Sequence, residues 1–262
     1  MTLRTLRIAV TLAVIASAAA LNAQEITVAA AADLQFAFQD VAARFEKQSG
    51  SRVKLVFGSS GNFFAQIQNG APFDVFCSAD LGYPQKLEAA GLTEPGSLYR
   101  YATGKIVLWV PKASPVDLGQ GLAALLDPDV HKIAIANPTH APYGRAAVAA
   151  LQHEKIYQRV SAKLVLGESV SQAASFVVSG SADAGIVALS LALAPAMKEK
   201  GRYAGIPADD YPAIVQAAVL LKPAQQTSVQ RELARRFLNF LKDPAIVEVM
   251  RGYGFSAPQT HP

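Results

Sequence analysis

The chain has 262 residues, of which 51% are hydrophobic and 17% are charged. This balance is typical of a folded globular protein and excludes extensive disorder. The formal net charge is only +4 and Lys and Arg form no continuous run, which excludes a basic stripe of the kind that binds nucleic acid.

Residues 1–23 have the pattern of a cleaved secretory signal peptide. Arg4 and Arg7 precede the apolar run IAVTLAVIASAAAL, and small residues continue to Ala23, where we expect cleavage. An uncleaved membrane anchor is the alternative, but this run is short for a membrane span. The mature chain then carries 22 basic and 20 acidic side chains. Because the single cysteine, Cys77, has no partner for an internal disulfide, we expect a soluble periplasmic protein that depends on its core for stability.

Strand-like and helix-like segments alternate through the first hundred residues. Short β-branched runs predict strands, and apolar residues at three- and four-residue steps, closed by glycine, predict helices. The predicted strands are 26–31, 53–58 and 74–79, and the predicted helices are 34–50, 62–70 and 83–91. This order indicates a parallel sheet with helices on both faces.

The alternation starts again after Tyr101. A long strand, 104–112, stops near Pro111, and a second long strand, 211–223, is bounded by prolines. Between them we expect strands at 131–138, 162–167 and 182–189 and helices at 144–157 and 170–180. Two amphipathic helices, divided at Asp243 and Pro244, complete the chain between 229 and 255.

This order predicts an α/β protein with two lobes. We expect lobe I to be discontinuous, formed by 24–103 and 222–262, and lobe II to be formed by 104–221. The two long strands are expected to pair and to link the lobes as a hinge. A cleft then lies between the lobes at the carboxyl ends of the strands, where open α/β sheets bind ligands.

Four places where a strand runs directly into a helix are candidate parts of that cleft. They are the segments AAAADLQ, VFGSSGNFF, IANPTHAPYGRAA and LGESVSQAA. Each alone is typical of an ordinary helix N-cap. Together, several helix N-termini facing one cleft hold an anion without any basic side chain, because the first N–H groups of each helix are unpaired.

Motifs for enzymatic chemistry are weak. The segment Gly58–Gly61, GSSG, lacks the spacing of a serine-hydrolase nucleophile elbow. The histidines show no metal-ligand spacing, so we expect no catalytic residue and no free-cation site. His140 is interpreted as a loop residue, and Arg145 either faces an anion or is a solvated residue of the first helical turn.

At these residues the sequence resembles the periplasmic molybdate-binding proteins of ABC importers. The matching segments are ITVAAAADL, FGSSGNFFAQIQNGAPFDVFCSAD, PKAS, IANPTHAPYG, GIV and YGF, which extend over essentially the whole mature chain. The resemblance implies a type II periplasmic-binding fold, with a mostly parallel sheet in each lobe and a two-strand hinge. It also implies no cofactor, a molybdate or tungstate ligand, and the membrane permease of an ABC importer as partner. We expect a monomer, which suits a protein that carries its ligand to a transporter.

The same resemblance places the oxyanion contacts at five residues. They are Asp33 and Val170, through backbone N–H groups, and Ser59, Tyr143 and Ser60. Ala188 stands where some relatives carry a tyrosine, and Tyr143 is expected to supply that phenol from the other side.

Asp33 is unusual at this position because an ionised carboxylate repels a dianion. Three arrangements would avoid this repulsion. The side chain turns away from the ligand, it accepts a hydrogen bond from a proton-bearing oxyanion such as phosphate or a phosphonate, or it coordinates the metal centre directly. The second possibility makes a binder of protonated oxyanions the first alternative function. A secreted serine hydrolase that uses Ser59 or Ser60 with His140 is a second alternative, and the effector-binding half of a transcription regulator is a third.

Overall fold

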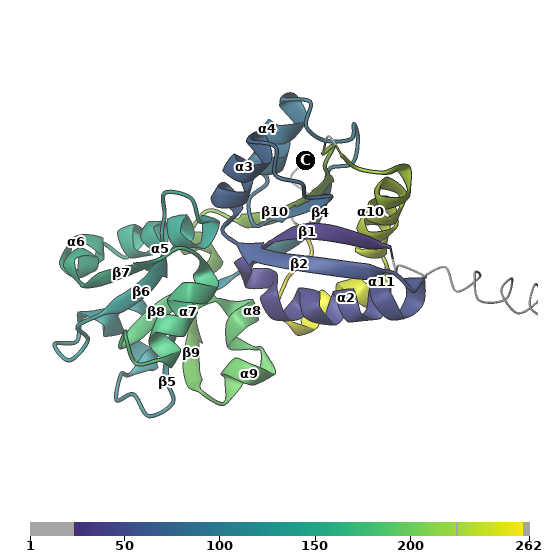
Figure 1. Ribbon diagram of the computed structural model, residues 1–262. Helices are drawn as coiled ribbons and strands as arrows, with labels where there is room; N and C mark the ends of the chain where they lie inside the picture. The colour runs from purple at the N-terminus through teal and green to yellow at the C-terminus, as the bar shows by residue number, and fades with distance from the viewer. Residues whose placement is uncertain (1–23, 224, 259–262) are drawn as a thin grey trace, which may run out of the picture.

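Two five-stranded sheets, each flanked by helices, form two lobes that lie side by side (Figure 1). The computed structural model describes residues 24–223 and 225–258, so the expected signal peptide lies outside the described residues. Within the described ranges, every helix is too short or too polar to cross a membrane. The predicted two-lobed α/β fold is confirmed.

The first lobe contains the sheet β2-β1-β3-β10-β4. Its strands are β1 (Glu25–Ala31), β2 (Arg52–Gly58), β3 (Val75–Ser78), β4 (Tyr99–Gly104) and β10 (Ile214–Leu220). Its helices are η1 (Ala32–Leu34), α2 (Gln35–Ser49), α3 (Ser60–Gln68), α4 (Gly82–Ala89), α10 (Ser228–Phe240) and α11 (Pro244–Gly252).

Both faces of the interior strand β1 are buried, which explains its apolar sequence. Val28 and Ala30 join the core formed with α2, α10 and α11, whereas Ala29 joins a separate cluster under α3 and α4. Successive side chains of a strand point to opposite faces, so β1 contributes to two helix layers at once.

The second lobe contains the sheet β7-β6-β8-β5-β9. Its strands are β5 (Ile106–Pro111), β6 (Ile133–Ala136), β7 (Leu164–Gly167), β8 (Ala184–Ala188) and β9 (Gly201–Gly205). Its helices are η2 (Leu118–Leu126), α5 (Pro142–His153), α6 (Tyr157–Val160), η3 (Ser161–Lys163), α7 (Val170–Val178), α8 (Leu189–Ala192), α9 (Pro195–Lys198) and η4 (Ala208–Asp210).

The sheets are mixed rather than mostly parallel. In the first lobe β1 pairs in parallel with β2 and β3, but β10 runs antiparallel to both of its neighbours. In the second lobe β6 pairs in parallel with β7 and β8, but β5 runs antiparallel to β8 and β9. Each lobe therefore combines a parallel half, which carries the strand-to-helix junctions, with an antiparallel half near the hinge.

The chain crosses between the lobes at Lys105, between β4 and β5, and again over 206–213, between β9 and β10. The two crossings touch, because Ile206 donates its N–H to the carbonyl of Ile106, and the Tyr211 hydroxyl lies 3.3 Å from the N–H of Ile106. A short hinge of two adjacent segments results.

The expected pairing of the two long strands is wrong, because β5 belongs to the second sheet and β10 to the first. Instead, β10 pairs with β4. The sequence did not predict β4 as a strand because it begins with the polar residues Tyr99 and Arg100. Because β10 is part of the first sheet, the chain returns to the first lobe before Ile214, earlier than the expected boundary at residue 222.

Candidate functional site

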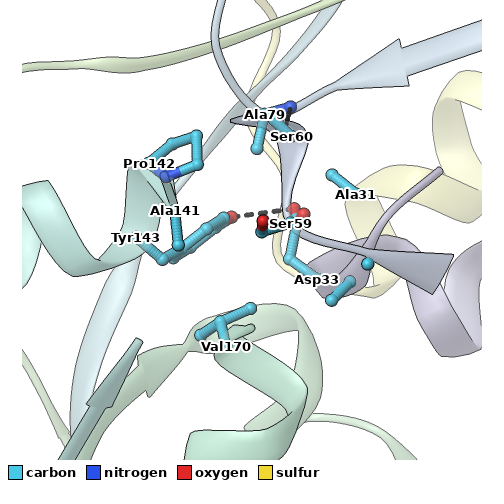
Figure 2. A pocket seen from close by; sticks show the side chains of 11 residues that line it. Ala31, Asp33, Ser59, Ser60, Ala79, Ala141, Pro142, Tyr143 and Val170 are labelled. Carbon is cyan, nitrogen blue, oxygen red and sulfur yellow. Dashed lines mark hydrogen bonds between the residues drawn. The ribbon is translucent and has the colours of Figure 1, made fainter. Parts of the chain in front are cut away.

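A small cavity lies between the lobes where the four strand-to-helix junctions meet (Figure 2). Its volume is about 10 Å³, which is room for about one water molecule. It is lined by Ala31, Ala32, Asp33, Gly58, Ser59, Ser60, Ala79, Ala141, Pro142, Tyr143 and Val170. All five residues expected at the site line this cavity, and none of the described residues that line it is basic.

Ser59 and Ser60 come from the junction between β2 and α3. Ser59 is the N-cap of α3, and its hydroxyl oxygen accepts the N–H of Asn62 at 3.3 Å. Ser60 Oγ accepts the N–H of Ala79 at 2.9 Å from the end of β3. Both serines are buried, and each hydroxyl carries one proton that it can donate.

Tyr143 reaches the cavity from the second lobe. It is the second residue of α5, after Pro142 at the first helical position, where a missing N–H costs nothing. The next position, Gly144, admits no side chain, because a Cβ there would clash with the carbonyl oxygen of Ala136 at the end of β6. This close approach of helix to strand carries the phenol into the space between the lobes.

Val170 begins α7, directly after Ser169, whose side chain caps the helix by accepting the N–H of Gln172 at 3.3 Å. As the first helical residue, Val170 has no intrahelical partner for its N–H. Its side chain is buried and lines the cavity opposite Ser59 and Asp33 (Figure 2). Its unpaired N–H makes Val170 a candidate backbone donor, the role that the family resemblance implies.

Asp33 is 1% exposed and lies in η1, directly after β1. Its Oδ2 accepts the Tyr143 hydroxyl at 2.9 Å, across the gap between the lobes, and the Gln216 side-chain amide at 2.5 Å (Figure 2 shows the first of these). Oδ1 has no partner among the described residues. Burial raises the pKa of this carboxyl to about 6, and the bonds from Gln216 and Tyr143 oppose that rise.

This geometry shows where the Asp33 side chain points. The carboxylate does not turn away from the second lobe, because it accepts the Tyr143 hydroxyl. Burial and the neighbouring Asp33 raise the pKa of Tyr143 well above its usual value, so Tyr143 acts as a hydroxyl donor at neutral pH. Asp33 and Tyr143 thus join the two lobes directly in this structure.

His140 takes part in the interface between the lobes, which its interpretation as a loop residue did not anticipate. Its Nδ1 lies 2.8 Å from Ser59 Oγ, and its Nε2 lies 3.4 Å from an oxygen of the exposed Glu168. The order serine, histidine, carboxylate resembles a hydrolase relay. However, the adjoining cavity is too small for an ester, and the structure gives the serine no exposed position.

Arg145 does not line the cavity. It extends from α5 to the first lobe, where it pairs with Asp80, and its guanidinium lies 5.6 Å from the ring centroid of Tyr83. The possibility that Arg145 faces the bound anion is therefore wrong for this structure, and the residue contributes a further contact between the lobes.

Two positioning residues were missed from the sequence. Gln216 is fully buried in β10, donates to Asp33 and accepts the Tyr101 hydroxyl at 2.8 Å. Ser190 of α8 donates its hydroxyl to the backbone carbonyl of Asp33 at 2.7 Å. A lone amide inside the apolar run AIVQAAVLL is the signal that could have identified Gln216, since buried polar groups need partners.

Two α/β lobes joined by a two-segment hinge, with helix N-termini and hydroxyls around a cavity between them, define a solute-binding protein. A family model described as bacterial extracellular solute-binding protein matches residues 26–256. The chain therefore belongs to the bacterial extracellular solute-binding proteins.

Similar proteins identify the branch of that family. The chain is 40% identical over 233 residues to the molybdate-binding protein ModA of Rhodobacter capsulatus, covering 89% of this chain and 88% of the relative. It is 41% identical over 239 residues to ModA of Azotobacter vinelandii, covering 91% and 92%. The structure of the A. vinelandii periplasmic molybdate-binding protein superposes with a TM-score of 0.82 at 38% identity, over 89% of this chain and all of that one. The resemblance to molybdate-binding proteins is thus confirmed, and these relatives give no support to the hydrolase alternative.

Proposed function

We propose that this chain captures a tetrahedral oxyanion, molybdate or tungstate, between its lobes and delivers it to the membrane permease of an ABC importer. The observation that carries the proposal is the meeting of four strand-to-helix junctions, two from each lobe, around one cavity. The relatives named as molybdate-binding proteins support this choice of ligand.

The proposed contacts are neutral hydrogen-bond donors. Ser59, Ser60 and Tyr143 offer hydroxyls, and Asp33 and Val170 offer backbone N–H groups. Preorganised donors at helix N-termini stabilise an anion in a site that excludes water. Because no basic side chain of the described residues lines the cavity, anion affinity should depend less on salt than in a lysine-lined site.

Capture requires the lobes to separate, because the present cavity holds only about one water molecule. Opening would break the direct contacts of Tyr143 with Asp33 and of Ser59 with His140. The anion then replaces these contacts, bridges both lobes and stabilises a closed form that the permease recognises.

The proposal extends to the life cycle of the protein. Residues 1–23 act as a signal peptide that is removed on export, and the mature chain works in the periplasm as a monomer. It acts by binding alone, with no catalytic residue and no cofactor, which agrees with its membership of a solute-binding family.

Titration calorimetry of the mature protein with molybdate, tungstate, sulfate and phosphate tests this function. We expect tight binding of the first two. Replacing Ser59→Ala together with Tyr143→Phe should weaken molybdate binding on the order of a hundredfold, because each variant removes one hydrogen bond to a charged ligand. The matched control, Ser175→Ala with Tyr203→Phe, changes the same residue types at positions outside the cavity and should leave affinity unchanged. Equal affinity of the two double variants would refute the site.

A binder of proton-bearing oxyanions such as phosphate or a phosphonate is the second candidate. One observation favours it: Asp33 Oδ1 lacks a partner among the described residues, and a carboxylate oxygen can accept a hydrogen bond from a protonated oxygen of such a ligand. Phosphate binding without molybdate binding in the same titration would establish this alternative.

A further inference from the structure

A buried acid in a proposed anion site is the feature that the oxyanion function leaves unexplained. Asp33 lines the cavity, is 1% exposed, and has no basic neighbour among the described lining residues. If it stayed ionised, it would repel a bound dianion at short range in a medium that screens poorly. The inference below rests on the proposed function.

The two oxygens of Asp33 differ in their hydrogen bonding. Oδ2 already accepts two donors, the Tyr143 hydroxyl at 2.9 Å and the Gln216 amide at 2.5 Å. Oδ1 is buried and has no partner in the part of the chain that the structure describes. A proton on Oδ1 would therefore disturb no existing bond and would give that oxygen an O–H to donate.

The groups that face Asp33 are neutral at neutral pH. Tyr143 of α5 and Tyr101 of β4 are the titratable ones, and both have pKa values raised well above the usual range by burial. Behind Tyr101 lies Cys77 of β3, whose thiol pKa is also raised by burial. Gln216 of β10 and Ser190 of α8 donate hydrogen bonds but do not titrate in water. Thus no cation among these described groups offsets the charge of Asp33.

We propose that Asp33 takes up one proton when the oxyanion binds, so that its carboxylic acid donates a hydrogen bond from Oδ1 to a ligand oxygen. The proton comes from the solvent, and no other covalent bond forms or breaks. The bound anion then faces a neutral carboxylic acid instead of a negatively charged carboxylate, which removes the repulsion. The site would select fully deprotonated dianions, since these only accept hydrogen bonds.

The protonation state before binding supports this coupling. Burial raises the pKa of Asp33 to about 6, so the group is mostly ionised at neutral pH before binding, and a further rise in its pKa beside a dianion would protonate it. For phosphate, the ligand would carry the proton and Asp33 would accept the hydrogen bond. Here Asp33 carries the proton and donates the hydrogen bond, so the ligand need not carry one.

Calorimetric titration of the full mature protein with molybdate, in buffers of different ionisation enthalpy, measures the protons taken up per anion. We expect about one proton at pH 7 to 8, with the apparent Kd rising about tenfold per pH unit in that range and flattening below about pH 6. Asp33→Asn keeps the shape and an acceptor for Tyr143 and Gln216, and places an N–H₂ donor at the Oδ1 position. This variant should take up no proton and should bind with an affinity independent of pH.

Ser59→Ala is the control, because it should weaken binding while proton uptake stays near one. Molybdate or tungstate binding with no proton uptake and a flat pH profile would overturn this inference and leave the proposed function intact. Uptake that persists in Asp33→Asn would also overturn it. Absence of binding of all four oxyanions by the unaltered protein, at any pH from 5.5 to 8, would instead refute the proposed function.

Discussion

The substitution Asp33→Asn should stabilise the anion-free protein at neutral pH. The folded protein holds the Asp33 proton more tightly than the unfolded chain, because burial raises its pKa from 3.8 to about 6. Stability from this group is therefore complete below pH 3.8 and is lost as the pH rises to about 6. That change in pKa corresponds to a penalty of about 3 kcal/mol at pH 7.5 and about 1 kcal/mol at pH 4.5.

Urea unfolding at these two pH values measures the effect. Asp33→Asn should raise the free energy of unfolding by up to about 3 kcal/mol at pH 7.5 and by about 2 kcal/mol less at pH 4.5. Asp74→Asn, a buried carboxylate outside the cavity that accepts the N–H of Thr27, is the control and should destabilise the protein at both pH values. A pH dependence of stability that is unchanged in Asp33→Asn would refute the reasoning.

Two further substitutions test the geometry around the cavity. Gly144→Ala should lower the free energy of unfolding by about 2 to 4 kcal/mol, since its Cβ would meet the carbonyl oxygen of Ala136, whereas Gly252→Ala, with open space around it, should be nearly neutral in the same urea titration. Arg145→Ala removes the ion pair with Asp80 between the lobes. In small-angle X-ray scattering, the variant should have a larger radius of gyration than the unaltered protein without anion, and the same radius with molybdate. A variant with the radius of the unaltered protein both with and without molybdate would contradict this role.

The junctions could be predicted because their signals are local. A β-branched run followed at once by residues with helical spacing, as at 53–58 and 62–70, fixes both the end of a strand and the start of a helix. Strands that run in parallel end at the same edge, so the convergence of the junctions followed from the order of elements. Ser59, Tyr143 and Val170 were identified in this way together with the family resemblance.

The hinge and the groups that hold Asp33 could not be predicted in the same way. β10 enters the first sheet through pairing with β3 and β4, including a bulge between Gln216 and Ala217, and nothing local in the sequence specifies that pairing. The contact of Ser190 with Asp33 joins residues 157 positions apart and depends on how the lobes meet. Such long-range contacts are set by tertiary packing rather than by periodicity.

The most direct test of the central claim is anomalous diffraction at the molybdenum edge from crystals of the mature protein grown with molybdate. We expect one strong molybdenum peak between the lobes. The molybdate oxygens around it should lie within hydrogen-bonding distance of Ser59 and Tyr143 and should face the first N–H of α7, at Val170. A peak outside the cavity, or crystals that bind molybdate without a peak between the lobes, would contradict it.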